Sequence, residues 1–217
     1  MIDLHTHSLF SDGELLPSEL IQRVEALSYD YIGITDHADA SNLDWIISRI
    51  VLVTRHVNQY RKVQAIPGVE LTHLPPETIP EMAAEARRLG ACLIVVHGET
   101  LVEPVPQCTN RAAVEADVDI LAHPGLITEE EARLAAKNGV LLEVSARKGH
   151  CLSNGHVVQM ARRTGAGLIL NTDSHGPGDL ITRSFAMRIA LGAGLDEKEF
   201  EQMIEAARAL AQKALSR

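Results

Sequence analysis

Ile2-Asp3-Leu4-His5-Thr6-His7 is a short apolar segment that ends in two histidines. Alternate side chains of a strand share one side, so His5 and His7 would project together at the carboxyl end of such a strand. An apolar run that ends in a residue able to hold a divalent metal occurs six more times along the chain. These further endings are Thr35–His37, Gly68–Glu70, Val95–Gly98, Ala122–Gly125, Leu142–Val144 and Thr172–His175.

Segments with strand character alternate with helical patterns along the chain. The alternation indicates a parallel sheet with right-handed crossovers. Seven strands that each end in a ligand-type residue favour a closed or nearly closed barrel, because an open doubly wound sheet concentrates its chemistry at one switch point. We expect strands at about 1–6, 31–36, 63–70, 92–97, 119–123, 140–145 and 168–172, and helices near 17–27, 42–60, 81–89, 110–116, 128–138, 154–164, 182–192 and 196–215.

The composition is that of an ordinary globular protein. The 217 residues are 46% hydrophobic and 23% charged, and no linker or composition break divides them, so we expect one α/β domain over 1–217. No segment approaches the roughly 18 consecutive apolar residues of a membrane helix. Met1 and Ile2 lead into the first strand without a signal-peptide pattern. Three cysteines without C-x-x-C spacing fit a reducing compartment, so the expected location is the cytoplasm, with no membrane partner.

The charge balance bears on partners. A net charge of −9 disfavours a nucleic-acid partner, because duplex-binding proteins present a basic face. Bound metal ions would still make a site locally positive. The sequence gives no indication of oligomeric state.

These motifs together resemble the polymerase-and-histidinol-phosphatase (PHP) family of metal-dependent phosphoesterases. The resemblance implies a distorted, TIM-barrel-like (β/α)7 barrel with a trinuclear metal site at the carboxyl ends of its strands. The matching pieces, in the order of the family, are Asp3-Leu4-His5-Thr6-His7-Ser8 with Ser11-Asp12-Gly13, Thr35-Asp36-His37, Glu70, His97, Ala122-His123-Pro124-Gly125 and Asp173-Ser174-His175.

The resemblance also implies the ligand sets of three divalent ions. Mixed histidine and carboxylate ligands accept Zn, Mn or Fe, so the metal stays open. Asp12 stands where some family members have a histidine, so the third site would have an oxygen ligand at this position. The sets would be His5, His7, Glu70 and Asp173 for the first ion, bridging Glu70 with His97 and His123 for the second, and Asp12, His37 and His175 for the third.

The charge of such a site favours a phosphorylated substrate. Six neutral imidazoles and three carboxylates around three divalent ions leave a net charge of about +3, which suits a phosphate dianion. The expected reaction is phosphoester hydrolysis through a metal-activated hydroxide. Asp173 is the candidate for handling the proton of the water, and a purely ligating role for Asp173 is the alternative.

The substrate contacts rest on weaker patterns. Arg147, Lys148 and His150 follow the sixth strand; the two cations could clamp a phosphate, or this segment is a solvated loop. Arg183 is a further candidate of the same kind. Glu143 either supports a ligand histidine or lies at a capped or solvated strand end.

Two loop features complete the expected site. The loop 98–109 is rich in Pro, Glu and Thr and is expected to overhang the site. His73, three residues beyond Glu70, is expected to be a loop histidine rather than part of the pocket.

We expect a phosphatase that acts on a small phosphorylated metabolite, and the resemblance brings forward histidinol phosphate. Three alternatives stay open. The first is a nuclease or nucleotide phosphatase of the same family. The second is an amidohydrolase, opposed by Asp12, His37 and His175, which a binuclear site does not need. The third is a non-catalytic scaffold or RNA-processing subunit, opposed by the complete ligand set and the acidic charge.

Overall fold

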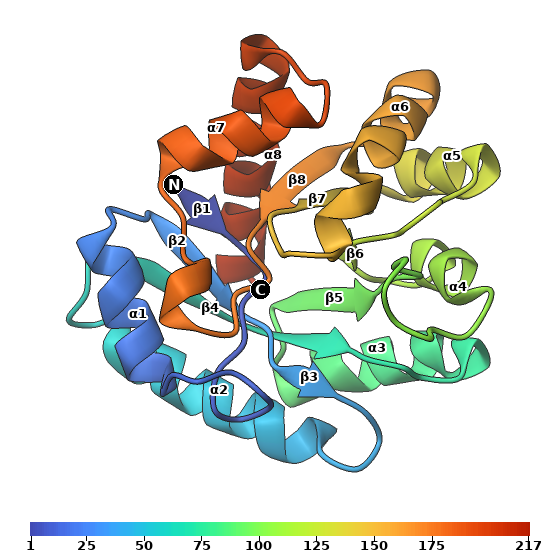
Figure 1. Ribbon diagram of the computed structural model, residues 1–217. Coiled ribbons are helices and arrows are strands. Elements are labelled where there is room, and N and C mark those ends of the chain that lie inside the picture. The colour runs from blue at the N-terminus through green and yellow to red at the C-terminus, as the bar shows by residue number, and fades with distance from the viewer.

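Seven parallel strands form a nearly closed barrel in the computed structural model, which describes residues 1–217 (Figure 1). A short additional strand, β3 (His37–Ala38), pairs with the end of β4 and continues the line of β2 beyond Thr35 and Asp36. The predicted strands and the barrel are thus confirmed. In pairing order the strands are β1 (Ile2–Asp3), β2 (Tyr31–Ile34), β4 (Gln64–Leu71), β5 (Leu93–His97), β6 (Ile120–Ala122), β7 (Leu141–Ser145) and β8 (Leu168–Asn171).

The first and last strands meet just beyond their carboxyl ends. Thr6 and Ser174 form an isolated parallel bridge. The backbone N–H of His7 donates to the carbonyl of Ser174 at 2.8 Å, and that of Asp173 donates to the carbonyl of His5 at 3.0 Å. These bonds bring the two ends of the sheet together and place His5, His7 and Asp173 side by side.

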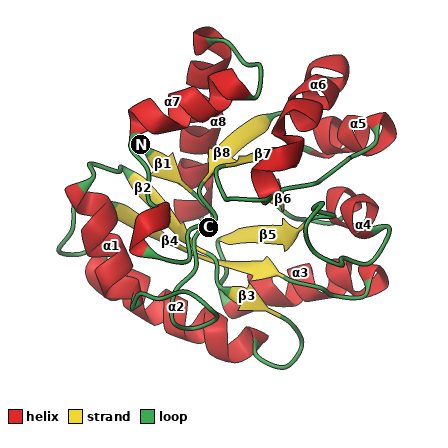
Figure 2. Cartoon of the chain, in the orientation of Figure 1, coloured by secondary structure: helices red, strands yellow, loops and turns green.

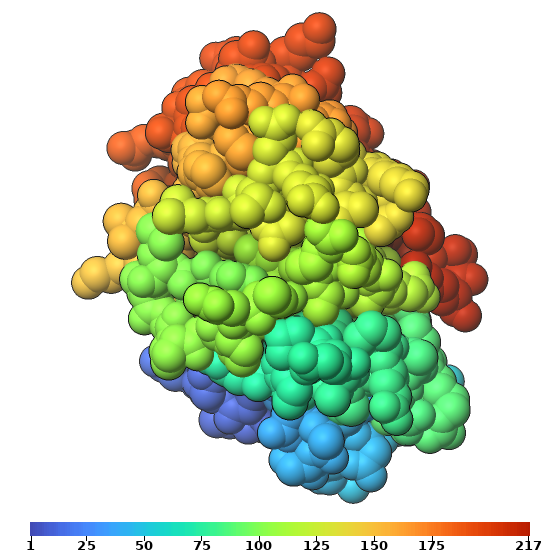
Figure 3. Space-filling view, turned by 90° about the vertical axis from the view of Figure 1, so that its right-hand side faces the viewer, coloured from blue at the N-terminus to red at the C-terminus, as the bar shows by residue number.

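Helices surround the barrel (Figure 2), and on the face seen in Figure 3 the green, yellow and orange segments follow one another in chain order. The start of α5 is a capping box, in which the Thr128 hydroxyl accepts from the N–H of Glu131 at 3.2 Å. No helix combines the length and hydropathy that a membrane span requires. The helices are α1 (Pro17–Ala26), α2 (Leu43–Val57), α3 (Ile79–Leu89), α4 (Thr109–Glu115), α5 (Glu129–Asn138), α6 (Asn154–Thr164), α7 (Arg183–Gly192) and α8 (Glu197–Leu215), with single 3-10 turns at Pro76–Thr78, His150–Ser153 and Pro177–Asp179.

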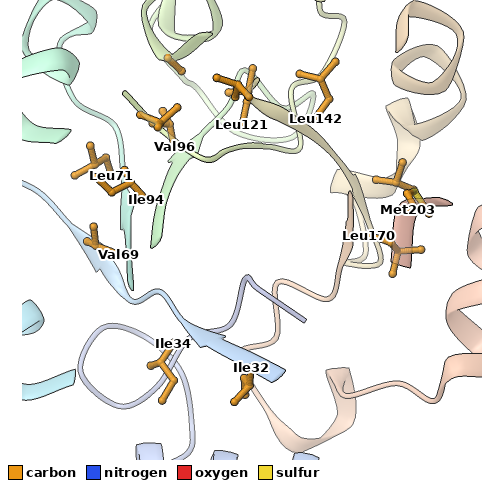
Figure 4. Packing of buried hydrophobic residues seen from close by; sticks show 14 of the residues in the cluster. Ile32, Ile34, Val69, Leu71, Ile94, Val96, Leu121, Leu142, Leu170 and Met203 are labelled. Atoms are coloured by element: carbon orange, nitrogen blue, oxygen red, sulfur yellow. The ribbon is translucent and has the colours of Figure 1, made fainter. Parts of the chain in front are cut away.

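Buried apolar side chains line both faces of the barrel wall. Those on the outer face, such as Ile34, Val69 and Leu142, point toward the surrounding helices (Figure 4). A second cluster fills the inside and includes Ile66, Val95 and residues of α8. Burial of these two layers is the main stabilising contribution to the fold.

Helix α8 covers the amino end of the barrel and lies behind the strands in Figure 1. Ala207, Ala211 and Ala214 recur on one helix face and pack into the inner cluster, where small side chains let the helix approach closely. The guanidinium of Arg217 donates to the carbonyl of Cys92, just before β5, at 2.8 Å. The ligand-type residues therefore lie at the opposite, carboxyl end of the strands.

Candidate metal centre

The structure brings the nine candidate ligands together at the carboxyl ends of the strands, as the sequence pattern predicts. They form four overlapping groups. Within each group, the candidate ligand atoms all lie within 4.8 Å of one another. Such clusters are consistent with several metal ions, and the role of each side chain as a ligand stays a prediction. The groups are His5, His7 and Glu70; His5, His123 and Asp173; Glu70, His97 and His123; and His7, Asp12, His37 and His175.

Glu70, near the end of β4, lies at the centre of the cluster and is fully buried. Its Oε1 lies 3.3 Å from His5 Nε2, and its Oε2 lies 2.7 Å from His37 Nδ1 and 3.5 Å from His7 Nε2. None of these contacts has the geometry of a well-formed hydrogen bond. The two Nε2 atoms are themselves 3.2 Å apart. A buried carboxylate whose contacts do not form good hydrogen bonds is costly. This arrangement fits bound cations.

Asp173 follows β8 and faces the same space. Its Oδ1 lies 3.2 Å from His7 Nε2, and its Oδ2 lies 3.6 Å from His123 Nε2. Asp173 and His123 both have positive φ angles, 52° and 26°. Non-glycine residues rarely adopt this conformation, and proteins keep such strain mainly at functional sites.

The charges of the cluster perturb one another strongly. Burial raises the pKa of Asp173 to about 7, and the neighbouring Glu70 and Glu143 act in the same direction. Burial opposes protonation of His5, but the same two glutamates together raise the pKa of His5 well above its ordinary value. Burial holds the pKa of His7 well below its ordinary value. Divalent cations would compensate the negative charge of the buried carboxylates in this cluster.

Asp12, from the loop between β1 and α1, completes the group at the rim. Its Oδ1 lies 3.1 Å from His175 Nε2 and 3.6 Å from His37 Nε2. The aspartate therefore places a carboxylate oxygen beside two of the candidate ligand histidines.

Asp36 holds the loop that carries Asp12. Its carboxylate accepts from the backbone N–H groups of Ser8 and Ser11, at 2.8 and 3.0 Å, and from both serine hydroxyls at 2.8 Å. The segment Thr35–His37 thus fixes the loop through one residue and adds a candidate ligand through the next.

Glu143 supports His5 from behind the cluster. Its Oε2 lies 2.9 Å from His5 Nδ1, and both side chains are fully buried. A carboxylate on the outer ring nitrogen orients a ligand histidine and strengthens it as a base. Of the two interpretations of Glu143, the structure favours support of a ligand histidine.

A cavity of about 410 Å³ lies beside the cluster, and no hydrophobic residue lines it. A lining of this kind suits a small charged molecule better than an apolar one. Beyond several of the candidate ligands, the lining residues are Ser11, Asn42, Thr72, His73, Glu103, Arg147 and His150.

The predicted substrate contacts divide into two groups. Arg147 and His150 line the cavity, and Arg147 Nη1 donates to the carbonyl of Asp173 at 3.0 Å. Lys148 is exposed and does not line the cavity. The expectation for Arg183 needs correction, because its guanidinium pairs with Glu201 of α8 at 2.5 and 2.6 Å instead of reaching the cavity.

Two further residues enter the site: Glu103, which the sequence did not single out, and His73, which was expected to lie outside the pocket. Glu103, from the loop after β5, places its carboxylate 3.0 Å from His97 Nε2 and 3.4 Å from His73 Nε2. The hydrogen bond with His97 holds the pKa of Glu103 at about 2. The loop thus overhangs the site as expected, whereas His73 lines the cavity against expectation. The only sequence signal for Glu103 is its place in that loop.

Comparison with known proteins identifies the family. The PHP domain matches residues 3–136 of the chain. An uncharacterized protein of Methanocaldococcus jannaschii is 48% identical over 204 residues, which cover 93% of this chain and 94% of that protein.

Solved structures share the fold. A chain of archaeal ribonuclease P with mature tRNA superposes with a TM-score of 0.72 at 19% identity, covering 99% of this chain and 91% of that one. The putative histidinol phosphatase hisK of Listeria monocytogenes gives a TM-score of 0.63 at 15% identity, covering 86% and 99%. At these identities the likeness shows the fold alone. The match to the PHP domain, which covers more than half of the residues, shows that the chain belongs to the PHP domain family.

Proposed function

We propose that the protein is a metal-dependent phosphoesterase, and specifically a phosphatase that acts on a small phosphorylated metabolite. The observation that carries the proposal is the convergence of nine ligand-type side chains around the fully buried carboxylate of Glu70, which faces several imidazoles beside a wholly polar cavity. Three divalent ions, Zn, Mn or Fe, are the proposed cofactors. Histidinol phosphate is the first substrate to test.

The three ligand sets inferred from the sequence would hold the ions. When bound, the ions would lower the pKa of a water and offset negative charge on phosphoryl oxygens. Asp173 Oδ2 lies 3.6 Å from His123 Nε2 and 3.7 Å from Arg147 Nε. This carboxylate therefore stands between the candidate ligands and the rim, where it would accept the proton of the attacking water.

Arg147 and His150 would bind the phosphate from the rim. A guanidinium offers paired N–H donors that match phosphate oxygens. The ring nitrogen His150 Nδ1 shares a hydrogen bond of 2.6 Å with the hydroxyl of Thr100, so its Nε2 is directed toward the cavity. A small cavity without apolar lining favours a compact, highly charged substrate over a long or apolar one.

A subunit role in RNA processing is the second candidate. The extent of the likeness to a chain of archaeal ribonuclease P favours it. The net charge of −9 opposes it, since stable RNA partners attract basic surfaces. A role without catalysis would also not require nine converged ligand side chains.

The experiment pairs elemental analysis of protein purified without chelators with a substrate panel. The panel contains histidinol phosphate, other phosphomonoesters, phosphodiesters, amides and lactones. We expect metal-dependent hydrolysis of phosphomonoesters. Turnover of phosphodiesters would point to a nuclease, turnover of amides or lactones to an amidohydrolase, and bound metal without turnover to a scaffold.

His97→Ala tests the site directly. Because metal assistance is worth several kcal/mol, kcat/KM should fall by more than about a hundredfold, with loss of bound metal, while the metal-free variant unfolds close to the temperature of the metal-free wild type. His56→Ala, an exposed histidine of α2, is the matched control and should behave as wild type. Full turnover by His97→Ala would refute the assignment.

A further inference from the structure

The carboxylate of Glu103 faces the cluster from the loop after β5. Its Oε2 lies 3.0 Å from His97 Nε2 and 3.4 Å from His73 Nε2, and its Oε1 lies 3.4 Å from His150 Nε2. These imidazoles follow three different strands, so Glu103 contacts several sides of the mouth at once. The side chain remains 38% exposed.

Hydrogen bonds fix the base of the loop after β5, whereas the backbone at its centre forms almost none. At the base, the Glu99 N–H donates to Asn110 Oδ1 at 3.0 Å, and the Asn110 N–H donates to Glu99 Oε1 at 2.9 Å. The backbone of 101–104 takes part in only one hydrogen bond, from the Val105 N–H to the Glu103 carbonyl within the loop. The Glu103 carboxylate is thus the polar link between the centre of the loop and the barrel.

The proposed second ion has fewer protein ligands than the first, so its coordination shell has room for a further carboxylate. In the proposed ligand sets the first ion has four protein ligands, whereas the second has only Glu70, His97 and His123. The atoms of this triad lie within 4.8 Å of one another, and so do those of His73, His97 and Glu103. His97 belongs to both groups, and its Nε2 is the nitrogen that Glu103 contacts.

We propose that Glu103 is a tenth metal ligand, which the loop after β5 supplies to the ion held by Glu70, His97 and His123. In this arrangement His73 orients the Glu103 carboxylate from the outer side. The backbone of His73 has a positive φ of 52°, a conformation that non-glycine residues rarely adopt. The inference rests on the metal site of the proposed function but not on phosphoester hydrolysis, so the two can fail separately.

The test uses Glu103→Gln, which keeps the shape of the side chain and removes its charge. Glu77→Gln is the matched control, because Glu77 is an exposed glutamate of the neighbouring segment without an ion pair or side-chain hydrogen bond. Each metal-free protein is titrated with Co²⁺ alone, by calorimetry and by visible absorption. Thermal unfolding checks that the variants are folded, and turnover on the substrate panel is measured separately.

We expect Glu103→Gln to weaken the binding of one ion by about tenfold or more, since even indirect partners of metal ligands contribute that much. At saturating Co²⁺ its visible spectrum should also shift, because the donor set of that ion changes. Glu77→Gln should match wild type in both measurements. Equal or tighter binding by Glu103→Gln would overturn the inference, and so would an unchanged spectrum, which would make Glu103 a partner of His97 rather than a ligand.

Discussion

Glu143→Gln isolates the contribution of the carboxylate behind His5. The amide keeps the shape of the side chain and can still accept from His5 Nδ1, but the negative charge is lost from a contact of 2.9 Å between two fully buried groups. The charge both orients the imidazole and makes it a stronger ligand. We therefore expect weaker metal binding with an intact fold.

The magnitude follows from the linkage between binding and stability. Loss of such a partner lowers metal affinity by about 10- to 100-fold. At a metal concentration about 100 times the wild-type Kd, binding stabilises the protein by about 2.7 kcal/mol, and this would fall to about 1.4 or 0.4 kcal/mol. For a chain of this size, the loss lowers Tm by roughly 3 to 9 °C.

The assay is differential scanning calorimetry of wild type, Glu143→Gln and the surface control Glu77→Gln, each with and without metal. Without metal, Glu143→Gln should unfold below the wild-type temperature, because it removes the charged partner of His5, whose pKa the buried glutamates raise. The metal-induced shift is therefore compared within each protein. With metal, only Glu143→Gln should lose part of the stabilisation. A metal-induced Tm shift equal to that of wild type would refute the reasoning.

Three further perturbations test other parts of the site. Arg147→Ala should raise KM for a phosphomonoester by roughly tenfold or more while metal content stays unchanged, given that hydrogen bonds to charged groups contribute about 1.5–3 kcal/mol; an unchanged KM would exclude a phosphate contact. Asp36→Ala should destabilise the protein by roughly 3 kcal/mol in urea unfolding, because the buried N–H of Ser8 and the half-buried N–H of Ser11 lose their acceptor, and a loss below about 0.5 kcal/mol would contradict this account. Metal affinity should rise with pH, because His5 must lose a proton to bind metal. Burial opposes the protonated form of His5, but Glu70 and Glu143 raise its pKa well above the ordinary value. Calorimetry in buffers of different ionisation enthalpy should detect this proton release at pH 7, and identical enthalpies in all buffers would contradict it.

The barrel and the cluster could be predicted because their signals are local. Each apolar run and the ligand-type residue that ends it are neighbours in the sequence, as in Ile2 to His7. Parallel strands then place all their carboxyl ends at one opening, so convergence of the side chains follows from the strand pattern alone. Thr35 and Asp36 interrupt the second strand without changing this outcome.

Other features depend on contacts that no local pattern encodes. In the sequence Arg183 resembles a phosphate-binding residue. In the structure its guanidinium pairs with Glu201 of α8, a contact that the sequence does not indicate. Glu103 reaches the site because its loop folds back over the mouth, a path that depends on tertiary packing of the whole rim. The alanine face of α8 has the spacing of any amphipathic helix, and only the assembled barrel shows that it fills the amino end.

The junction between β1 and β8 has a consequence for how the protein stays closed. Only a few backbone bonds cross this seam, near Thr6 and Ser174, yet His5 and His7 lie on one side of it and Asp173 on the other. An ion held by these three residues would cross-link the two margins of the sheet. Metal removal should therefore speed amide exchange along β1 and β8 more than along β5 and β6, which lie across the barrel.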